Sequence, residues 1–206
     1  MARRKRKIDR ELGKLADTSI IVIASEDDKA VKQYFELFES TRVQFNVLNT
    51  DDGKSSPQAV LERIDKYKAE NQIGEGDEFW IVTDVDHWAT PGHVKNLIEV
   101  LRKSKQKGVS VAISNPCFDL WLLLHFADLP ASQTRKCDDI GALIRDTVGY
   151  YNKLRIYELP FSMDLVERAI ARSRAADPDG KILEINGTHV YRILEEMAKA
   201  EIISLS

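Results

Sequence analysis

The chain has 206 residues, of which 43% are hydrophobic and 31% are charged. This balance is typical of a soluble globular protein whose hydrophobic core is large enough to be stable without disulfide bonds or a structural metal. The formal net charge is only −3, which excludes a strongly basic protein that wraps nucleic acid but leaves room for a local basic patch.

Segments typical of strands and of helices alternate along much of the chain. The stretches that predict strands are 18–24, 43–48, 79–85 and 109–113, and the first of them, a continuous β-branched run, is expected to be buried on both faces. The stretches with helical spacing of apolar residues are 28–39, 56–67, 90–108, 117–126, 138–147, 162–176 and 188–200. Alternation of this kind predicts an α/β fold with a mainly parallel four-stranded sheet, flanking helices and right-handed crossovers.

We expect three parts along the chain. Residues 1–16 form a basic N-terminal segment, residues 17–128 an α/β core, and residues 129–206 a helical C-terminal extension packed on that core. The basic segment is either a solvated tail or an arm that contacts nucleic-acid phosphates.

Three features favour a cytoplasmic protein without a membrane segment. The longest apolar stretch, 120–126, is too short to span a bilayer, and the N-terminus lacks the apolar core of a secretory signal. Cys117 and Cys137 are too few for a disulfide framework, and their spacing matches no zinc motif. They fit a reducing cytoplasm, with Cys117 interpreted as a small buried residue and not as a nucleophile.

Acidic residues follow two of the predicted strands. Asp84 and Asp86 close the third run, and in a strand such i and i+2 side chains point the same way, about 6–7 Å apart. Glu26 follows the first run, and Ser114 and Asn115 follow the fourth. Because parallel strands bring their carboxyl ends to one edge, we expect these groups to converge there. Carboxylates so placed predict a Mg²⁺ (or Mn²⁺) site that handles phosphate.

Each of these acids also has a plainer interpretation. Asp84 and Asp86 are alternatively exposed loop carboxylates, or caps for the helix that begins near residue 90. Asp27 and Asp28, next to Glu26, are typical of a first helical turn. Glu26 itself is either a metal ligand or a general base beside the metal.

A long and unusual segment suggests a family. Residues 114–126 read Ser-Asn-Pro-Cys-Phe-Asp-Leu-Trp-Leu-Leu-Leu-His-Phe. This resembles the signature of the RloB-like (AbiL-type) proteins, S-N-P-C-F-E-L-W-L-L-L-H-F, over thirteen positions with one conservative change. Three further pieces follow the order of the family pattern: Glu26 with Tyr34, the strand end Asp84-Val-Asp86, and Val190-Tyr191. The resemblance therefore spans roughly residues 18–200.

The resemblance implies a Toprim-like fold, akin to topoisomerase–primase and OLD-family nuclease domains. It also implies a prokaryotic defence protein that acts on nucleic acid, DNA or RNA, often encoded beside an ABC- or AAA-type ATPase. By position, Glu26, Asp84 and Asp86 match the acidic metal set of Toprim domains, and Asn115 and Asp119 match the signature after the fourth strand. The oligomeric state is left open.

The chain departs from the family pattern after the first strand. The family has Glu-Gly-x-x-Thr-Glu there, whereas this chain has Asp27 in place of the glycine and Val31 in place of the second glutamate. One expected carboxylate is therefore missing, which puts catalysis in question.

Five further residues carry open interpretations. Asn115 is expected to cap the signature helix and to aim its amide into the site, where it would contact substrate, with Pro116 at the first helical position. Asp119 faces either the cleft or solvent. His87 is a candidate for metal or phosphate contact. His125, on an apolar helix, is interpreted as a core histidine, with a catalytic role as the alternative.

Arg168 and Arg172 lie one turn apart on a single predicted helix. They form either a solvated face or a wall that contacts phosphate beside the metal site.

Three functions follow from these observations. The first is a Mg²⁺-dependent nuclease of an abortive-infection or restriction-associated defence system. The second is a catalytically weak or inactive module that binds and regulates an ATPase partner. The third, ranked lowest, is an Asp-nucleophile phosphohydrolase, because Asp-x-Asp also follows a strand in that class.

Overall fold

The computed structural model describes residues 19–26, 28–38, 43–49, 56–85, 91–129, 136–176 and 184–199. The basic segment 1–16 lies outside these ranges.

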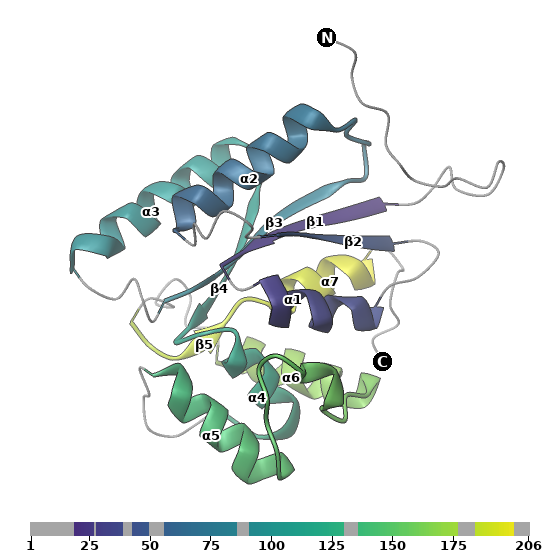
Figure 1. The fold of residues 1–206 in the computed structure, drawn as a ribbon, viewed down its shortest axis with the longest axis vertical. Helices are drawn as coiled ribbons and strands as arrows, with labels where there is room; N and C mark the ends of the chain where they lie inside the picture. Colours follow the sequence, from purple (N-terminus) through teal and green to yellow (C-terminus); the bar gives the residue numbers. More distant parts are fainter. Residues whose placement is uncertain are drawn as a thin grey trace, which may run out of the picture.

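A five-stranded sheet with the order β2-β1-β3-β4-β5 forms the centre of the molecule (Figure 1). Its strands are β1 (Ser19–Ser25), β2 (Val43–Leu48), β3 (Glu78–Asp84), β4 (Ser110–Asn115) and β5 (Gly187–Thr188). The first four strands are parallel, and β5 runs antiparallel to β4. The predicted α/β fold with a mainly parallel sheet is therefore confirmed.

The predicted number of four strands is wrong, because the C-terminal segment adds a fifth strand. In β5, Gly187 pairs with Asn115, and Thr188 pairs with Ser114. The hydroxyls of Ser114 and Thr188 also share a hydrogen bond of 2.8 Å. A strand of two residues is too short to leave a period in the sequence, so the prediction merged residue 188 into the following helix.

The helices match the predicted segments closely. They are α1 (Asp28–Phe35), α2 (Pro57–Glu70), α3 (Pro91–Gln106), α4 (Asp119–Phe126), α5 (Cys137–Val148), α6 (Met163–Ala175) and α7 (Tyr191–Lys199), with 3-10 turns η1 (Glu36–Phe38) and η2 (Ile156–Glu158). Ser56 caps α2 as predicted, because its hydroxyl accepts a hydrogen bond from the Ala59 amide at 3.2 Å.

Two hydrophobic layers cover the two faces of the sheet. On one face, alternate residues of β1 and β3 such as Val22 and Ile81 pack against α2 and α3. On the other face, Ile23 and Val82 pack with α1, α4, α5, α6 and α7 in one continuous cluster (Figure 1). The central strands β1 and β3 are buried on both sides, which explains their apolar runs.

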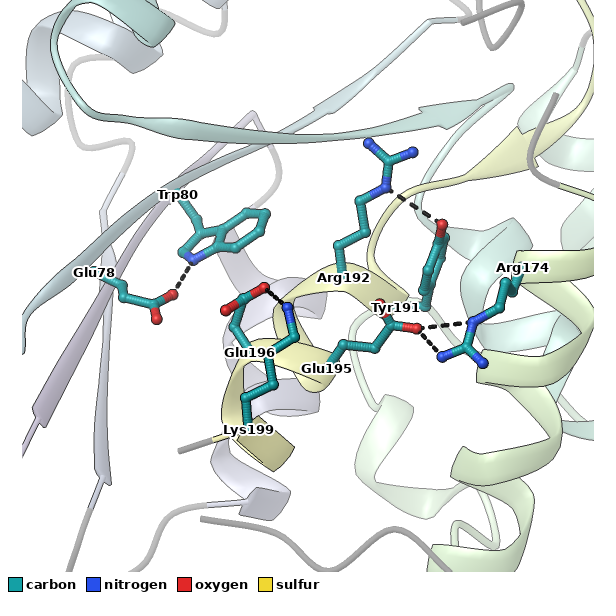
Figure 2. A network of polar contacts seen from close by, with 8 residues as sticks. All are labelled: Glu78, Trp80, Arg174, Tyr191, Arg192, Glu195, Glu196 and Lys199. Carbon is teal, nitrogen blue, oxygen red and sulfur yellow. Dashed lines mark hydrogen bonds and ion pairs between the residues drawn. The ribbon is translucent and has the colours of Figure 1, made fainter. Parts of the chain in front are cut away.

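Polar contacts at the surface of α7 and of the nearby strand β3 are shown in Figure 2. The Nε atom of Arg174, on α6, donates a hydrogen bond of 3.0 Å to Glu195 of α7. On β3, the indole nitrogen of Trp80 donates to Glu78 at 2.8 Å. The Arg174–Glu195 contact joins α6 to α7, whereas the Trp80–Glu78 contact lies within β3; α7 packs on the same sheet face as α1.

The strand order creates a switch point between β1 and β3. From β1 the chain turns to one side through α1 and enters β2, whereas from β3 it continues to the other side through α3 and enters β4. The helices α1 and α3 lie on opposite faces (Figure 1). Chain segments that leave two neighbouring strands toward opposite faces open a crevice at the carboxyl ends, and open α/β sheets bind ligands there.

Candidate functional site

Glu26 and Asp84 flank the switch point, as the sequence predicted for strand ends. Ser25 pairs with Val82 in the parallel register of β1 and β3, so Glu26 falls beside Thr83. The Thr83 hydroxyl donates a hydrogen bond to the Oε1 atom of Glu26. Thr83 is almost fully buried, at 1% exposure. A fixed hydroxyl of this kind orients the carboxylate at the strand end.

Asp84 is held from the opposite side by the signature segment. The Phe118 amide donates a hydrogen bond of 2.9 Å to the Oδ1 atom of Asp84. The next residue, Val85, donates its amide to the carbonyls of Ser114 at 2.9 Å and Pro116 at 3.0 Å. The loop between β4 and α4, which contains the cis Asn115–Pro116 bond, thus fixes the end of β3.

The contacts that hold the two carboxylates lie on opposite faces of the sheet, since Glu26 is bound by Thr83 and Asp84 is bound by the Phe118 amide. Thr83 belongs to the face covered by α2 and α3, and Asp84 to the face covered by α4, because successive strand residues alternate. An ion shared by Glu26 and Asp84 would therefore lie beyond the end of β3, over the edge of the sheet. Asp86 and His87 follow there in sequence, but both lie outside the described residues.

The donor set at this edge suits a hard cation. Glu26 and Asp84 offer carboxylate oxygens, which are the ligands that Mg²⁺ and Mn²⁺ prefer. A carboxylate has two oxygens with about four lone-pair directions, so it can accept a hydrogen bond and bind a cation at the same time.

Two residues at this edge were missed by sequence reasoning. Thr83 orients Glu26, and a polar residue inside an otherwise apolar run was the signal for it. Arg63, on α2, donates from Nη1 to the Ser25 carbonyl at 3.0 Å. Its guanidinium therefore lies beside the residue that precedes Glu26. No pattern in the sequence connects Arg63 with the first strand.

Asn115 does not cap the signature helix, contrary to the prediction. Its side-chain nitrogen donates to the Ile185 carbonyl at 3.1 Å, and its own carbonyl accepts from Asn186 at 3.1 Å. The helix α4 begins only at Asp119, with Phe118 in the cap position and no side-chain cap. Asn115 therefore joins β4 to the segment that enters β5.

Arg172 is not part of a phosphate-binding wall beside the carboxylates, contrary to that interpretation. Its Nη1 atom donates to the carbonyl of Leu124 at 2.7 Å and its Nε atom to Asp128 at 2.6 Å. These partners lie at the C-terminal end of α4. An eight-residue helix is about 12 Å long, so Arg172 caps the end of α4 that is remote from Asp84. Arg168, one turn earlier on α6, is exposed.

His125 is a core histidine, as the favoured interpretation held. Its Nδ1 atom lies 2.9 Å from the Trp121 carbonyl and its Nε2 atom 3.0 Å from the Tyr34 hydroxyl. A carbonyl only accepts, so Nδ1 carries the proton and Nε2 accepts from Tyr34. Burial lowers the pKa of His125 from 6.5 to about 4, and burial also raises the pKa of the Tyr34 phenol. The imidazole is neutral and structural.

Asp119 faces neither solvent nor an open cleft. It is 3% exposed, and its Oδ1 atom lies 3.9 Å from the ammonium of Lys153. Beside it, Cys117 and Cys137 form a disulfide. Cys117 is buried as predicted, but the pairing was not anticipated. Twenty residues separate the two cysteines in sequence, and only the packing of α5 on α4 brings them together.

Comparison with known families identifies this chain. The family model of the RloB-like proteins matches residues 21–197. The chain belongs to the RloB-like family. The match covers the switch point, the signature segment and the helices up to α7, so the edge with Glu26 and Asp84 lies within the shared part. No curated protein and no solved structure matches the chain.

Within the described ranges, no helix has both the length and the apolar character needed to cross a bilayer.

Proposed function

We propose that this RloB-like protein is a Mg²⁺-dependent nuclease of a prokaryotic defence system, with a Toprim-like acidic site built from Glu26, Asp84 and Asp86. The observation that carries the proposal is the position of Glu26 and Asp84 at the β1–β3 switch point, each carboxylate held by a hydrogen bond from a buried neighbour. A cytoplasmic location and a nucleic-acid substrate fit this chemistry.

In this proposal the residues have distinct tasks. Glu26, Asp84 and Asp86 hold the cation, which supplies charge neutralisation at the phosphodiester and a more acidic water when bound. Thr83 fixes the orientation of Glu26 through its hydroxyl. The Phe118 amide fixes Asp84, so that the signature loop and the acidic edge form one rigid unit. Arg63 favours the approach of a phosphate to this edge.

A second function is favoured by one observation. Val31, a residue of α1, stands where the resemblance implies a second glutamate. Its side chain points into the hydrophobic core and is 1% exposed. This position therefore offers no carboxylate to a metal. A protein with an incomplete metal set would act as a module that binds and regulates an ABC- or AAA-type ATPase.

Cleavage assays on the purified chain separate the two functions. We expect Mg²⁺- or Mn²⁺-dependent cleavage of single-stranded or duplex DNA, or of RNA. The variants Asp84→Asn and Glu26→Gln should lower the rate by about a hundredfold or more, because they remove charge where the phosphodiester is stabilised.

The matched control is Glu70→Gln, which neutralises an exposed acid at the end of α2. It should cleave like the unmodified chain. Undiminished cleavage by Asp84→Asn would refute the nuclease proposal. Absence of Mn²⁺ binding at millimolar concentration, with a folded chain, would favour the regulatory module.

A further inference from the structure

A second cluster of metal-ligating side chains lies at the junction of α4 and α5. The Sγ atoms of Cys117 and Cys137 and a carboxylate oxygen of Asp119 all lie within 4.8 Å of one another. Cys117 and Asp119 are buried, and Cys137 is half-buried. The ligand atoms of a tetrahedral Zn²⁺ ion, at about 2.0–2.3 Å from the metal, lie about 3.3–3.8 Å apart. Reduction of the Cys117–Cys137 disulfide would let the two sulfurs move apart to this spacing, so that the three side chains can enclose one ion.

The surroundings of both sulfurs favour the thiolate form that a metal requires. Cys137 is the first residue of α5, and Cys117 precedes the first residue of α4 by two positions. The two helices therefore begin at the cluster. The positive end of a helix dipole stabilises a neighbouring anion, so a helix N-terminus favours the thiolate form of a cysteine.

A divalent ion would offset most of the negative charge that the three ligands carry when they bind it. Two thiolates and the Asp119 carboxylate carry three negative charges. The ammonium of Lys153, 3.9 Å from Asp119, supplies one positive charge and a divalent cation supplies two. Without such an ion the two cysteines remain thiols, because two neighbouring thiolates are favourable in this largely buried place only when a cation offsets their charge.

We propose that in the reduced protein Cys117, Cys137 and Asp119 bind one Zn²⁺ ion, with the half-buried side of Cys137 leaving the fourth position to water. Two sulfurs and one oxygen form a borderline-soft set that suits Zn²⁺ and not Mg²⁺, so this site is chemically distinct from the edge with Glu26 and Asp84. In a reducing cytoplasm, which is part of the proposed function, such a cysteine pair is more often a metal site than a disulfide.

The two states of the cluster are related by a balanced reaction. A phosphine reductant cleaves the disulfide and takes an oxygen from one water molecule, which yields phosphine oxide and two thiols. Zn²⁺ then replaces the two thiol protons, which are released to solvent, while Asp119 is already ionised. In either state, the cluster fastens α5 to the segment whose Phe118 amide holds Asp84.

Cobalt substitution tests this proposal on the full chain. The phosphine-reduced protein should bind one Co²⁺ per chain, with a thiolate-to-cobalt charge-transfer band that added Zn²⁺ removes. The oxidised protein should show no such band. Zn²⁺ should also raise the Tm of the reduced chain, and a chelator should reverse that rise.

Variants locate the site. Cys137→Ser should remove the band or reduce it strongly, and Asp119→Asn should weaken Zn²⁺ binding by at least about ten- to a hundredfold, the usual cost of losing even an outer-shell partner. The matched control Asp138→Asn, at an exposed acid beside Cys137, should bind Co²⁺ normally. An undiminished band in Cys137→Ser, or no metal binding by a reduced and folded chain, would overturn the proposal. The Asp84→Asn variant should keep the band, so failure of the nuclease proposal is recognised separately.

Discussion

Acidification should destabilise this protein through one buried residue, His125. The imidazole is enclosed by aromatic rings, with the Trp121 ring centroid at 4.9 Å and the Phe161 centroid at 5.0 Å. Its folded-state pKa is about 4, against 6.5 for an ordinary histidine, because burial disfavours the charged form. As the pH falls below 6.5, the unfolded chain therefore binds a proton that the folded chain does not. Stability that is fully present above pH 6.5 is lost as the pH falls toward 4.

The size of this effect follows from the two pKa values. A difference of about 2.5 units, at about 1.4 kcal/mol per unit, gives a total loss of about 3 kcal/mol. About 2 kcal/mol of this should be lost between pH 7 and pH 5. Domains of this size are stable by about 5–15 kcal/mol, so the loss is a considerable fraction.

Urea unfolding at a series of pH values, followed by tryptophan fluorescence, measures the effect. The matched variant is His125→Gln, which keeps a polar side chain but does not titrate. The variant should be less stable than the unmodified chain at pH 7, and the gap should narrow by about 2 kcal/mol at pH 5. Carboxylates that titrate in this range contribute equally to both proteins. If the two stability curves stay parallel between pH 7 and pH 5, the assignment of His125 as a neutral core residue is refuted.

Three further predictions concern the site and its supports. Arg172→Ala should destabilise the fold by about 1–3 kcal/mol, because buried carbonyls of α4 lose their hydrogen-bond donor. Arg168→Ala, at an exposed residue of the same helix, should change the stability measured by urea unfolding by less than about 0.5 kcal/mol. Equal effects of the two substitutions would contradict the capping role of Arg172. Thr83→Val should keep the fold but weaken Mn²⁺ binding in titration calorimetry by about tenfold, because Glu26 loses its orienting hydroxyl; unchanged affinity would remove that role. Val31→Glu, which restores the family residue, should lower the Tm and not raise metal affinity, because its side chain enters the core; a stable variant with tighter Mn²⁺ binding would show the opposite.

The helices and strands of this protein could be predicted from the sequence because each one produces a recognisable pattern of residues within its own segment. The β-branched run of β1, the Ser56 cap of α2 and the apolar signature helix α4 were all predicted within a few residues. Alternation of strands and helices was enough to give the parallel sheet and to bring Glu26 and Asp84 to one edge.

Contacts between distant segments were decided only by the tertiary structure. Arg172 reaches carbonyls 47 and 48 residues away, and Cys117 meets Cys137 because α5 packs on α4. The short strand β5 is held by hydrogen bonds to β4 and not by any preference of its own two residues. A side chain's partner across the fold depends on how helices and strands pack, and packing leaves no period in the sequence. The sequence by itself therefore determined the α/β elements and the neighbouring strand ends that carry Glu26 and Asp84. The packing decided which polar side chains contact those strand ends and which hold the helices together.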